Sequence, residues 1–417
     1  METIKLIKKM KKITVIMALV GLALTASAQL RLDNAKNYAN PKKGYYDKAK
    51  IEIDAACEEE GTKSNPEVWA WKGYIYCRLG ESEKPKIKKV CPENWAEIAY
   101  EAALKSKELN TEKEAGIIEL NNAVFKTVAG RFIDEAYNDY ENAGKNNDTS
   151  LYRACINKVD KGIKIYQSSG AQDPQIKESV NYARYIGGSA ARVLGDNKSA
   201  KMFYKPLVRA GYDKEYVYQS LVAIYQYEKD TIEAMKVAKT FTEKHPNDYK
   251  AFLLGARVSA WAGNVESAKT YAKAAMEKAT EITDVADKSA LICNIADIYS
   301  DIPDYETAQA EFARAIEIMP NNPMAYNGLG RLHYNKGIDF AKAADLVPPD
   351  KQDEYDQMMA KATQEYEESI KMYKKSLDIN DKSDYEKQQR FVEALRSIKM
   401  VYARVNRPLD DLKVYEQ

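Results

Sequence analysis

The side chains best suited to acid–base catalysis or metal binding are few in this chain and far apart. Only two of its 417 residues are histidines, His245 and His333, which excludes a mechanism or metal site that needs several imidazoles. The densest acidic run is Glu58-Glu59-Glu60, but charged residues make up 30% of the chain and nothing distinguishes this run as a general acid and base. The sequence also has no nucleophile, zinc-protease or phosphate-loop motif. We therefore predict no catalytic residue, no metal site, no cofactor and a protein that is not an enzyme.

The five cysteines offer either disulfide chemistry or small buried side chains. They are Cys57, Cys77, Cys91, Cys155 and Cys293. Their odd number forbids complete internal pairing, and no C-x-x-C spacing supports a zinc site. Cys77 and Cys91 bracket one irregular segment and are the best candidates for a disulfide in an exported protein. The alternative is that all five are buried on helices as thiols.

The N-terminus has the pattern of a secretory signal. Five lysines between residues 5 and 12 precede an apolar run over residues 13–24, and Ala26-Ser27-Ala28 follows. We predict a signal peptide over residues 1–28, starting at Met1 or Met10, and a mature N-terminus at Gln29. The mature protein would be exported to the periplasm or the extracellular space, without stable membrane insertion. A retained N-terminal anchor is the alternative, whereas Gln29 in place of cysteine gives no support to a lipid anchor.

The charge balance limits the class of partner. The chain has 63 basic and 62 acidic side chains, and removal of the five Lys and one Glu in residues 1–28 leaves 58 and 61, a net charge of −3. Nucleic-acid binding rests on neutralising many phosphates with basic side chains. We therefore expect no nucleic-acid partner.

The sequence repeats itself with a period of 34 residues. The clearest copy contains Ile292, Ile295, Ala296, Tyr299, Ala308, Phe312, Ala315 and Pro320, and the next begins with Tyr326, Leu329, Gly330 and His333. Each copy has two apolar stripes at helical spacing, separated by a turn near Gly195, Gly263 or Pro303-Asp304. Small residues such as Gly188 and Gly330 lie where the two helices would cross closely. The pattern predicts an all-α solenoid of stacked helix–turn–helix repeats.

These residues closely resemble the tetratricopeptide repeat (TPR) family. Trp69, Gly73 and Tyr76 match the first helix of an early unit, and Ala96, Tyr100 and Ala103 match its second helix after eleven extra residues that include Cys91 and Pro92. Ala49, Ile53 and Ala56 match the second helix of a leading partial unit. The C-terminal block is similar to that of many secreted TPR proteins of Bacteroidetes-type bacteria, with 27 extra residues and one long helix over residues 350–377. The resemblance implies a fold that binds peptides or proteins.

The organisation that follows has five parts. We predict the signal peptide over 1–28, N-terminal TPR-like units with an inserted loop over 29–112, a diverged helical region of unfixed pairing over 113–179, a central TPR array over 180–334, and a long-helix insertion with a capping TPR-like unit over 335–417. A cap with a polar surface protects the end of a solenoid.

The residues between the apolar positions of the first helices would line a concave groove. They are Tyr182, Tyr185, Arg192, Tyr216, Gln219, Gln226, Lys250, Arg257, Asp297, Asn327, Arg331 and Tyr334. Tyrosine provides rigid amphipathic contact area, and arginine offers a two-pronged donor to carboxylates. Four of them, Lys250, Arg257, Asn327 and Arg331, are similar to the basic-plus-amide clamp that some TPR domains use on a C-terminal carboxylate, without reproducing its full pattern.

Two functions remain in competition. The first is an exported, non-enzymatic scaffold that binds a peptide or protein segment in its groove, in a cell-envelope or secreted assembly. The alternative is a glycan-binding accessory protein of a bacterial sugar-capture system, since the chain has four tryptophans that stack well on sugars if they are exposed. Trp69 occupies a packing position, which favours the first function.

Overall fold

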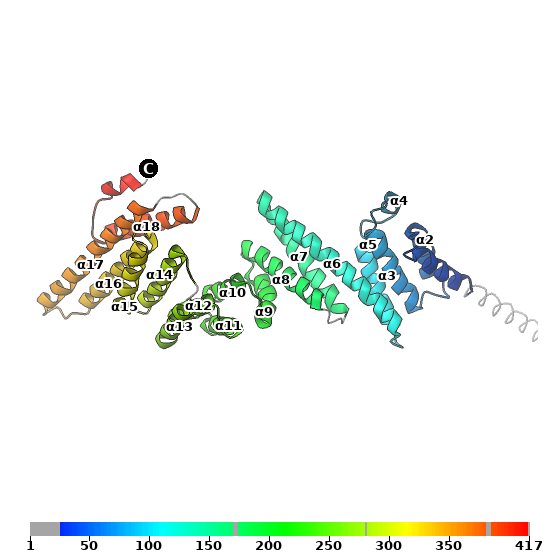
Figure 1. Ribbon diagram of the computed structural model, residues 1–417, viewed down its shortest axis with the longest axis horizontal. Helices are drawn as coiled ribbons and strands as arrows, with labels where there is room; N and C mark the ends of the chain where they lie inside the picture. The colour runs from blue at the N-terminus through cyan, green and yellow to red at the C-terminus, as the bar shows by residue number, and fades with distance from the viewer. Residues whose placement is uncertain (1–25, 170–173, 280–281, 381–384, 416–417) are drawn as a thin grey trace, which may run out of the picture. The chain divides into compact units, whose positions relative to one another are not determined.

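The computed structural model describes residues 26–169, 174–279, 282–380 and 385–415, and most of them are helical (Figure 1). The predicted all-α solenoid of paired helices is confirmed. Most of the predicted signal peptide lies outside the described residues, so it stays a prediction. Among the described helices, none combines the length and apolarity needed to span a bilayer. The chain divides into two compact units, residues 1–207 and 208–417.

The first unit contains helices of very different lengths. After a helix over residues 26–39 come α2 (Tyr46–Glu58), α3 (Pro66–Gly80), the short α4 (Pro85–Lys88), α5 (Trp95–Leu109), α6 (Ala115–Asn146), α7 (Thr149–Ser168), α8 (Pro174–Val193) and most of α9 (Asn197–Ala210). The helix over 26–39 buries Leu32 and Ala35 in the same core as Ile53 of α2. The leading unit therefore has both helices and is not the partial unit that the sequence predicted.

The region of unfixed pairing, 113–179, has a simple architecture. The 32-residue α6 and the 20-residue α7 pack against each other, and α8 packs against both. Their contacts bury Ala136, Val159 and Ala183 in one apolar cluster. These two helices are longer than the helices of the regular pairs in the second unit.

The second unit repeats the helix pair more regularly. It contains α10 (Glu215–Tyr227), α11 (Thr231–Lys244), α12 (Tyr249–Trp261), α13 (Val265–Lys278), α14 (Val285–Asp301), α15 (Tyr305–Ile318), α16 (Pro323–Asp345), α17 (Gln352–Ile379), α18 (Tyr385–Arg404) and the 3-10 helix η2 (Asp410–Tyr415). Helices α11 and α15 end just before Pro246 and Pro320, since proline disrupts the interior of a helix. Gly195 and Gly263 follow helix ends with φ of +70° and +75°, a conformation that glycine adopts without strain.

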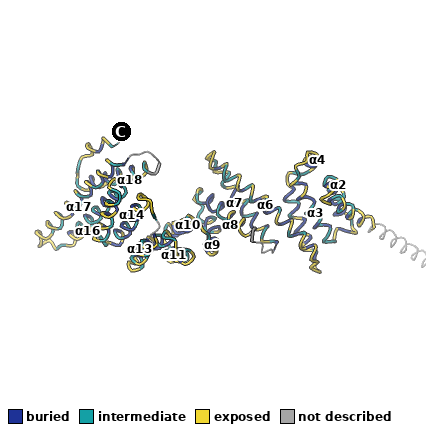
Figure 2. Tube along the Cα trace, viewed as in Figure 1, coloured by how far each residue is buried: buried dark blue, intermediate teal, exposed yellow. Residues whose placement is uncertain are grey.

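Two close helix crossings depend on glycine, which has no side chain. A Cβ added to Gly188 would lie 2.2 Å from the ring of Tyr204, and one added to Gly330 would lie 2.8 Å from the ring of Tyr373. Both rings are buried, and Figure 2 shows how burial follows the helix faces that meet one another. The predicted small-residue crossings are therefore real contacts at these two positions.

The 27 extra residues near the C-terminus lengthen both helices of one pair. Helix α16 runs on to Asp345 and packs along the long α17, with Gly337 against the ring of Tyr366. The long helix predicted over 350–377 is observed as Gln352–Ile379. The insertion is thus an extended hairpin of two helices.

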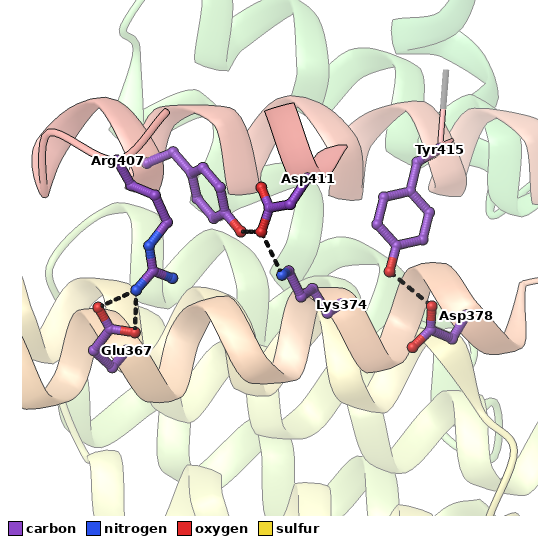
Figure 3. Close-up of polar contacts among 7 residues, drawn as sticks. Glu367, Lys374, Asp378, Arg407, Asp411 and Tyr415 are labelled. Atoms are coloured by element: carbon purple, nitrogen blue, oxygen red, sulfur yellow. Dashed lines mark hydrogen bonds and ion pairs between the residues drawn. The ribbon is translucent and has the colours of Figure 1, made fainter. Parts of the chain in front are cut away.

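The C-terminal segment, residues 405–415, lies across α17 (Figure 3). Leu412 is fully buried in the apolar cluster that α17 and α18 share. Around it are polar contacts: Arg407 Nη2 donates to both carboxylate oxygens of Glu367 at 2.8 and 2.9 Å, Lys374 Nζ lies 2.7 Å from Asp411 Oδ2, Tyr402 donates to Asp411 at 2.8 Å, and Tyr415 donates to Asp378 at 2.7 Å. This segment therefore packs against the apolar cluster that α17 and α18 share, and the capping role stays a prediction.

Candidate functional site

The first helices of successive pairs in the second unit form one face. Helix α10 contacts α12, α12 contacts α14, and α14 contacts α16. Apolar residues at helical spacing are buried between the helices, so the polar residues between them point away from the core. Two hollows lie on this face, and they contain half of the predicted groove residues.

The first hollow has a volume of about 300 Å³ and is formed by α10, α12 and α14. Its lining combines polar and apolar side chains: Glu215, Gln219, Tyr249, Lys250, Leu253, Leu254, Arg257, Asp287, Ala290, Leu291 and Asn294. Gln219 Nε2 donates to Glu215 Oε1 at 2.6 Å, and Lys250 Nζ lies 3.2 Å from Glu215 Oε2. The pKa of Lys250 is raised by this hydrogen-bonded carboxylate. The charge of Lys250 is thus already compensated within the site.

Arg257 is the exception in the first hollow. Its Nη2 donates to Asn294 Oδ1 at 2.5 Å, and Asn294 is a neutral amide. No described carboxylate lies within ion-pair distance of the Arg257 guanidinium, although its charge favours the ionised forms of the more distant Asp297 and Asp301. The side chain is exposed, so an arriving anion can reach it.

The second hollow, of about 250 Å³, lies among α14, α16, α17 and α18. Asp297 Oδ1 and Arg331 Nη2 form an ion pair of 2.5 Å inside it. Burial raises the pKa of Asp297 to about 6, and the nearby Arg331 only partly opposes this shift. The carboxylate of Asp297 thus occupies Arg331, which the sequence analysis had expected to bind the carboxylate of a partner.

This ion pair corrects the predicted role of Arg331. The clamp considered from the sequence uses both Arg257 and Arg331 as donors to a partner carboxylate. Arg331 already binds Asp297, and removing it would leave a largely buried carboxylate without its partner, which is strongly destabilising in general. Of these two arginines, Arg257 is the one that lacks a carboxylate within ion-pair distance.

The raised pKa of Asp297 has a consequence for stability. The folded-state pKa of about 6 exceeds the ordinary 3.8, so between about pH 4 and 6 the native state keeps a proton that the unfolded chain releases. At neutral pH the ionised side chain therefore destabilises the fold, by at most about 3 kcal/mol because the side chain is still 29% exposed.

We expect Asp297→Asn to raise the free energy of unfolding at pH 7.5 by up to about 3 kcal/mol and to have little effect near pH 4, where wild-type Asp297 is protonated. Urea unfolding of wild type and Asp297→Asn at both pH values gives the difference in their free energies of unfolding. The contributions of the other carboxylates are common to both proteins and cancel in this difference. A variant that is less stable than wild type at pH 7.5 would show that the attraction of Arg331 outweighs burial.

The other predicted groove residues do not all join these hollows. Gln219, Lys250 and Arg257 line the first hollow, and Asp297, Asn327 and Arg331 line the second. Tyr216 and Gln226 lie on α10 outside the first hollow, and the half-buried Tyr334 packs against Tyr366 with ring centroids 5.8 Å apart. Tyr182, Tyr185 and Arg192 belong to the first unit.

The three first-unit residues have a different setting. Tyr182 packs against Tyr185 on α8 and Tyr137 on α6, with ring centroids 6.4 and 6.3 Å apart. Tyr137 and Tyr182 are 41% and 44% exposed, so the three rings form a partly exposed aromatic row. Arg192 Nη1 donates to Asn197 Oδ1 at 3.1 Å, which fixes it at the turn between α8 and α9.

The cysteines and histidines occupy structural positions. All five cysteines are free thiols, so the Cys77–Cys91 disulfide considered from the sequence is not formed. Cys77 is buried on α3, and burial raises its pKa, whereas the half-buried Cys91 faces the carbonyl of Pro92. His333 Nδ1 lies 2.6 Å from Glu365 Oε2. In the described part of the chain, no three metal-binding side chains gather into a cluster.

Several lining residues escaped the sequence reasoning. Asn294 lies one helical turn before Asp297 and was not assigned to the groove. Arg390, Glu393 and Ser397 reach the second hollow from α18, which the sequence identified only as part of a cap. The period of 34 residues carries no signal for the three α18 residues, because α18 follows an insertion that interrupts the period.

Comparison with known proteins gives similarity in fold only. No family model matches the chain, and no curated protein does. A tetratricopeptide repeat protein from Parabacteroides merdae is similar, at 13% identity over 64% of this chain and 99% of its own, with a TM-score of 0.39. YrrB, described as a TPR protein with an unusual peptide-binding site, is 19% identical over 45% of this chain and 95% of its own, with a TM-score of 0.30. Yeast Tom70 is 15% identical over 94% of this chain and 99% of its own, with a TM-score of 0.29.

Proposed function

We propose that this protein is an exported, non-enzymatic scaffold that binds an extended segment of another protein along the first helices of its second unit. The observation that supports this most is Arg257 in the first hollow, a cation whose partner is an amide and not a carboxylate. The remaining charges of the two hollows include internal pairs, Lys250 with Glu215 and Arg331 with Asp297. A partner carboxylate would therefore bind at Arg257.

The lining of the first hollow suits a peptide around that carboxylate. Arg257 would donate charge-assisted hydrogen bonds to an acidic side chain or a C-terminal carboxylate. Tyr249 and Leu253 provide aromatic and apolar surface beside it, and Gln219 and Asn294 provide amides for a peptide backbone. An extended chain along α10, α12, α14 and α16 would then pass from the first hollow towards the second.

We expect Arg257→Ala to weaken peptide binding by about tenfold or more, since a hydrogen bond to a charged group contributes about 1.5–3 kcal/mol. Peptides selected from a displayed random library on the wild-type chain supply the ligand, and fluorescence anisotropy measures its affinity for each variant. Binding to wild type should weaken as salt rises.

Lys273→Ala is the matched control for this experiment. Lys273 is an exposed cation on α13, which is a second helix of its pair. Lys269 is unsuitable, because its Nζ forms an ion pair of 2.7 Å with Asp304 Oδ2. If the Arg257 and Lys273 variants bind the selected peptides equally well, the first hollow is not the anchor.

Glycan binding is the second candidate, and one observation favours it. The aromatic row of Tyr137, Tyr182 and Tyr185 presents two exposed rings to solvent, and flat apolar ring faces suit stacking against sugars. A glycan array probed with wild type and Tyr182→Ala separates the candidates. Glycan signals lost with Tyr182→Ala but kept with Arg257→Ala would favour this second function.

A further inference from the structure

Two lysine-rich segments of the first unit lie side by side: the turn over residues 40–48, which leads into α2, and the inserted loop over residues 81–93, which contains α4. Lys86 Nζ lies 2.7 Å from Asp47 Oδ2. Gly44 has a φ of +59°, and a Cβ added to it would lie 3.3 Å from Lys84 Nζ. Ile87 is buried in the core of the unit and fixes the loop against it, and Figure 1 shows α4 beside α2.

These two segments, named here the basic face, concentrate positive charge. They contain seven lysines (Lys42, Lys43, Lys48, Lys84, Lys86, Lys88 and Lys89) and four acids (Asp47, Glu81, Glu83 and Glu93). All seven lysines are exposed. The excess of three positive charges stands against a net charge of +1 for the whole chain. The face is therefore more basic than the rest of the protein.

Most of this charge is not compensated locally. Lys86 pairs with Asp47 and Lys88 with Glu83. Among the described residues, no carboxylate lies within ion-pair distance of the other lysines; Lys43 donates instead to the amide oxygen of Asn37 at 2.5 Å, and Lys48 lies 5.3 Å from the ring centroid of Tyr45. The lysines without an ion-pair partner belong to both segments.

The basic face also exposes apolar surface. Tyr45 in the turn is 48% exposed and Val90 in the loop is 42% exposed. Aromatic side chains are favoured at the level of lipid headgroups, where one end is apolar and the other is wet. Lysine clusters bind anionic lipid surfaces through diffuse charge, whereas recognition of nucleic-acid phosphates favours the planar fork of arginine, and neither segment contains an arginine.

We propose that the basic face is a peripheral docking surface for an anionic lipid membrane, with the lysines near the headgroups and Tyr45 and Val90 at the interface. This contact is reversible and requires no membrane-spanning helix. It also gives a role to the inserted loop, which a regular repeat does not need for its packing. The residues of the basic face belong to the first unit, whereas the two hollows belong to the second unit.

The test uses the full chain with vesicles of equal parts phosphatidylcholine and phosphatidylglycerol, and with vesicles of phosphatidylcholine alone. Acetylation of lysines followed by mass spectrometry reports each side chain separately, which matters because residues 1–25 also carry lysines and an apolar run. We expect Lys42, Lys43, Lys84 and Lys89 to be protected on anionic vesicles only. The exposed Lys145, Lys273, Lys288 and Lys375 should remain reactive.

A matched pair of variants completes the test. Replacing the four basic-face lysines with glutamine should weaken sedimentation with anionic vesicles about tenfold or more, because each lysine near the surface adds to the attraction. The same replacement at the four control lysines should have little effect. Protection by inorganic phosphate alone, equal loss in both variants, or equal protection by duplex DNA and by vesicles would each overturn the proposal.

Discussion

Replacing Gly330 with leucine is expected to lower the free energy of unfolding of the second unit by at least about 1–3 kcal/mol. A Cβ at this position would lie 2.8 to 2.9 Å from three ring atoms of Tyr373, which is 3% exposed and cannot move aside. The crossing is also tied by Ser369 Oγ, which donates to the Gly330 carbonyl at 2.7 Å. A larger side chain would push α16 and α17 apart and strain that hydrogen bond.

Gly130→Leu is the control for the Gly330 substitution. Gly130 lies inside α6, and no atom outside its own helix neighbourhood lies within 4 Å of an added Cβ. Leucine there should stabilise the helix slightly, since glycine costs about 1 kcal/mol in a helix interior. Hydrogen exchange separates the two units, because a repeat array couples mainly neighbouring elements. Unchanged hydrogen exchange in α16 and α17 of the Gly330 variant would contradict the claim that these helices need a glycine where they cross.

Truncating Leu412 to alanine is expected to cost about 2–5 kcal/mol, the usual range for a fully buried leucine. Its side chain has no exposed surface and lies in the cluster formed with Tyr402 and Phe391. The surrounding polar contacts should matter much less. Arg407 forms two hydrogen bonds with Glu367, but exposed ion pairs contribute at most about 1 kcal/mol.

Urea unfolding of Leu412→Ala and Arg407→Ala compares burial with polar contacts in the same segment. We expect the leucine variant to expose α17 and α18 to hydrogen exchange, while the arginine variant changes little. A larger loss from Arg407→Ala would mean that the ion pair, and not the apolar anchor, holds the C-terminal segment in place.

The period of 34 residues predicted the helix pairs because each unit repeats the same packing problem. Gly330 and Ala308 are small since two helices cross there, and a small side chain at a crossing is visible in the sequence. The long helix over 350–377 was predicted, but the extension of α16 was not. Helix α16 runs on to Asp345 and packs along α17, with Gly337 against the ring of Tyr366.

The sequence analysis named polar residues of the candidate site, but it did not identify which of them pair with one another. Asp297 and Arg331 lie 34 residues apart, at equivalent places in neighbouring repeats, and they pair across the helices. The residue 34 positions before Arg257 is Ala223, which offers no carboxylate. A comparison of neighbouring repeats in the sequence therefore distinguishes the two arginines: Arg331 has a carboxylate at the equivalent place of the preceding repeat, and Arg257 has none.

The central claim is that a partner segment lies against the first helices of the second unit. A photo-crosslinking amino acid placed at Gln219, on the edge of the first hollow, tests it most directly with a selected peptide, and the same amino acid at Lys273 is the control. With the peptide below its dissociation constant, we expect adducts from position 219 that fall about tenfold or more when Arg257 is also changed to alanine, and none from position 273. Equal adducts from both positions, or adducts at 219 that are undiminished without Arg257, would contradict the claim.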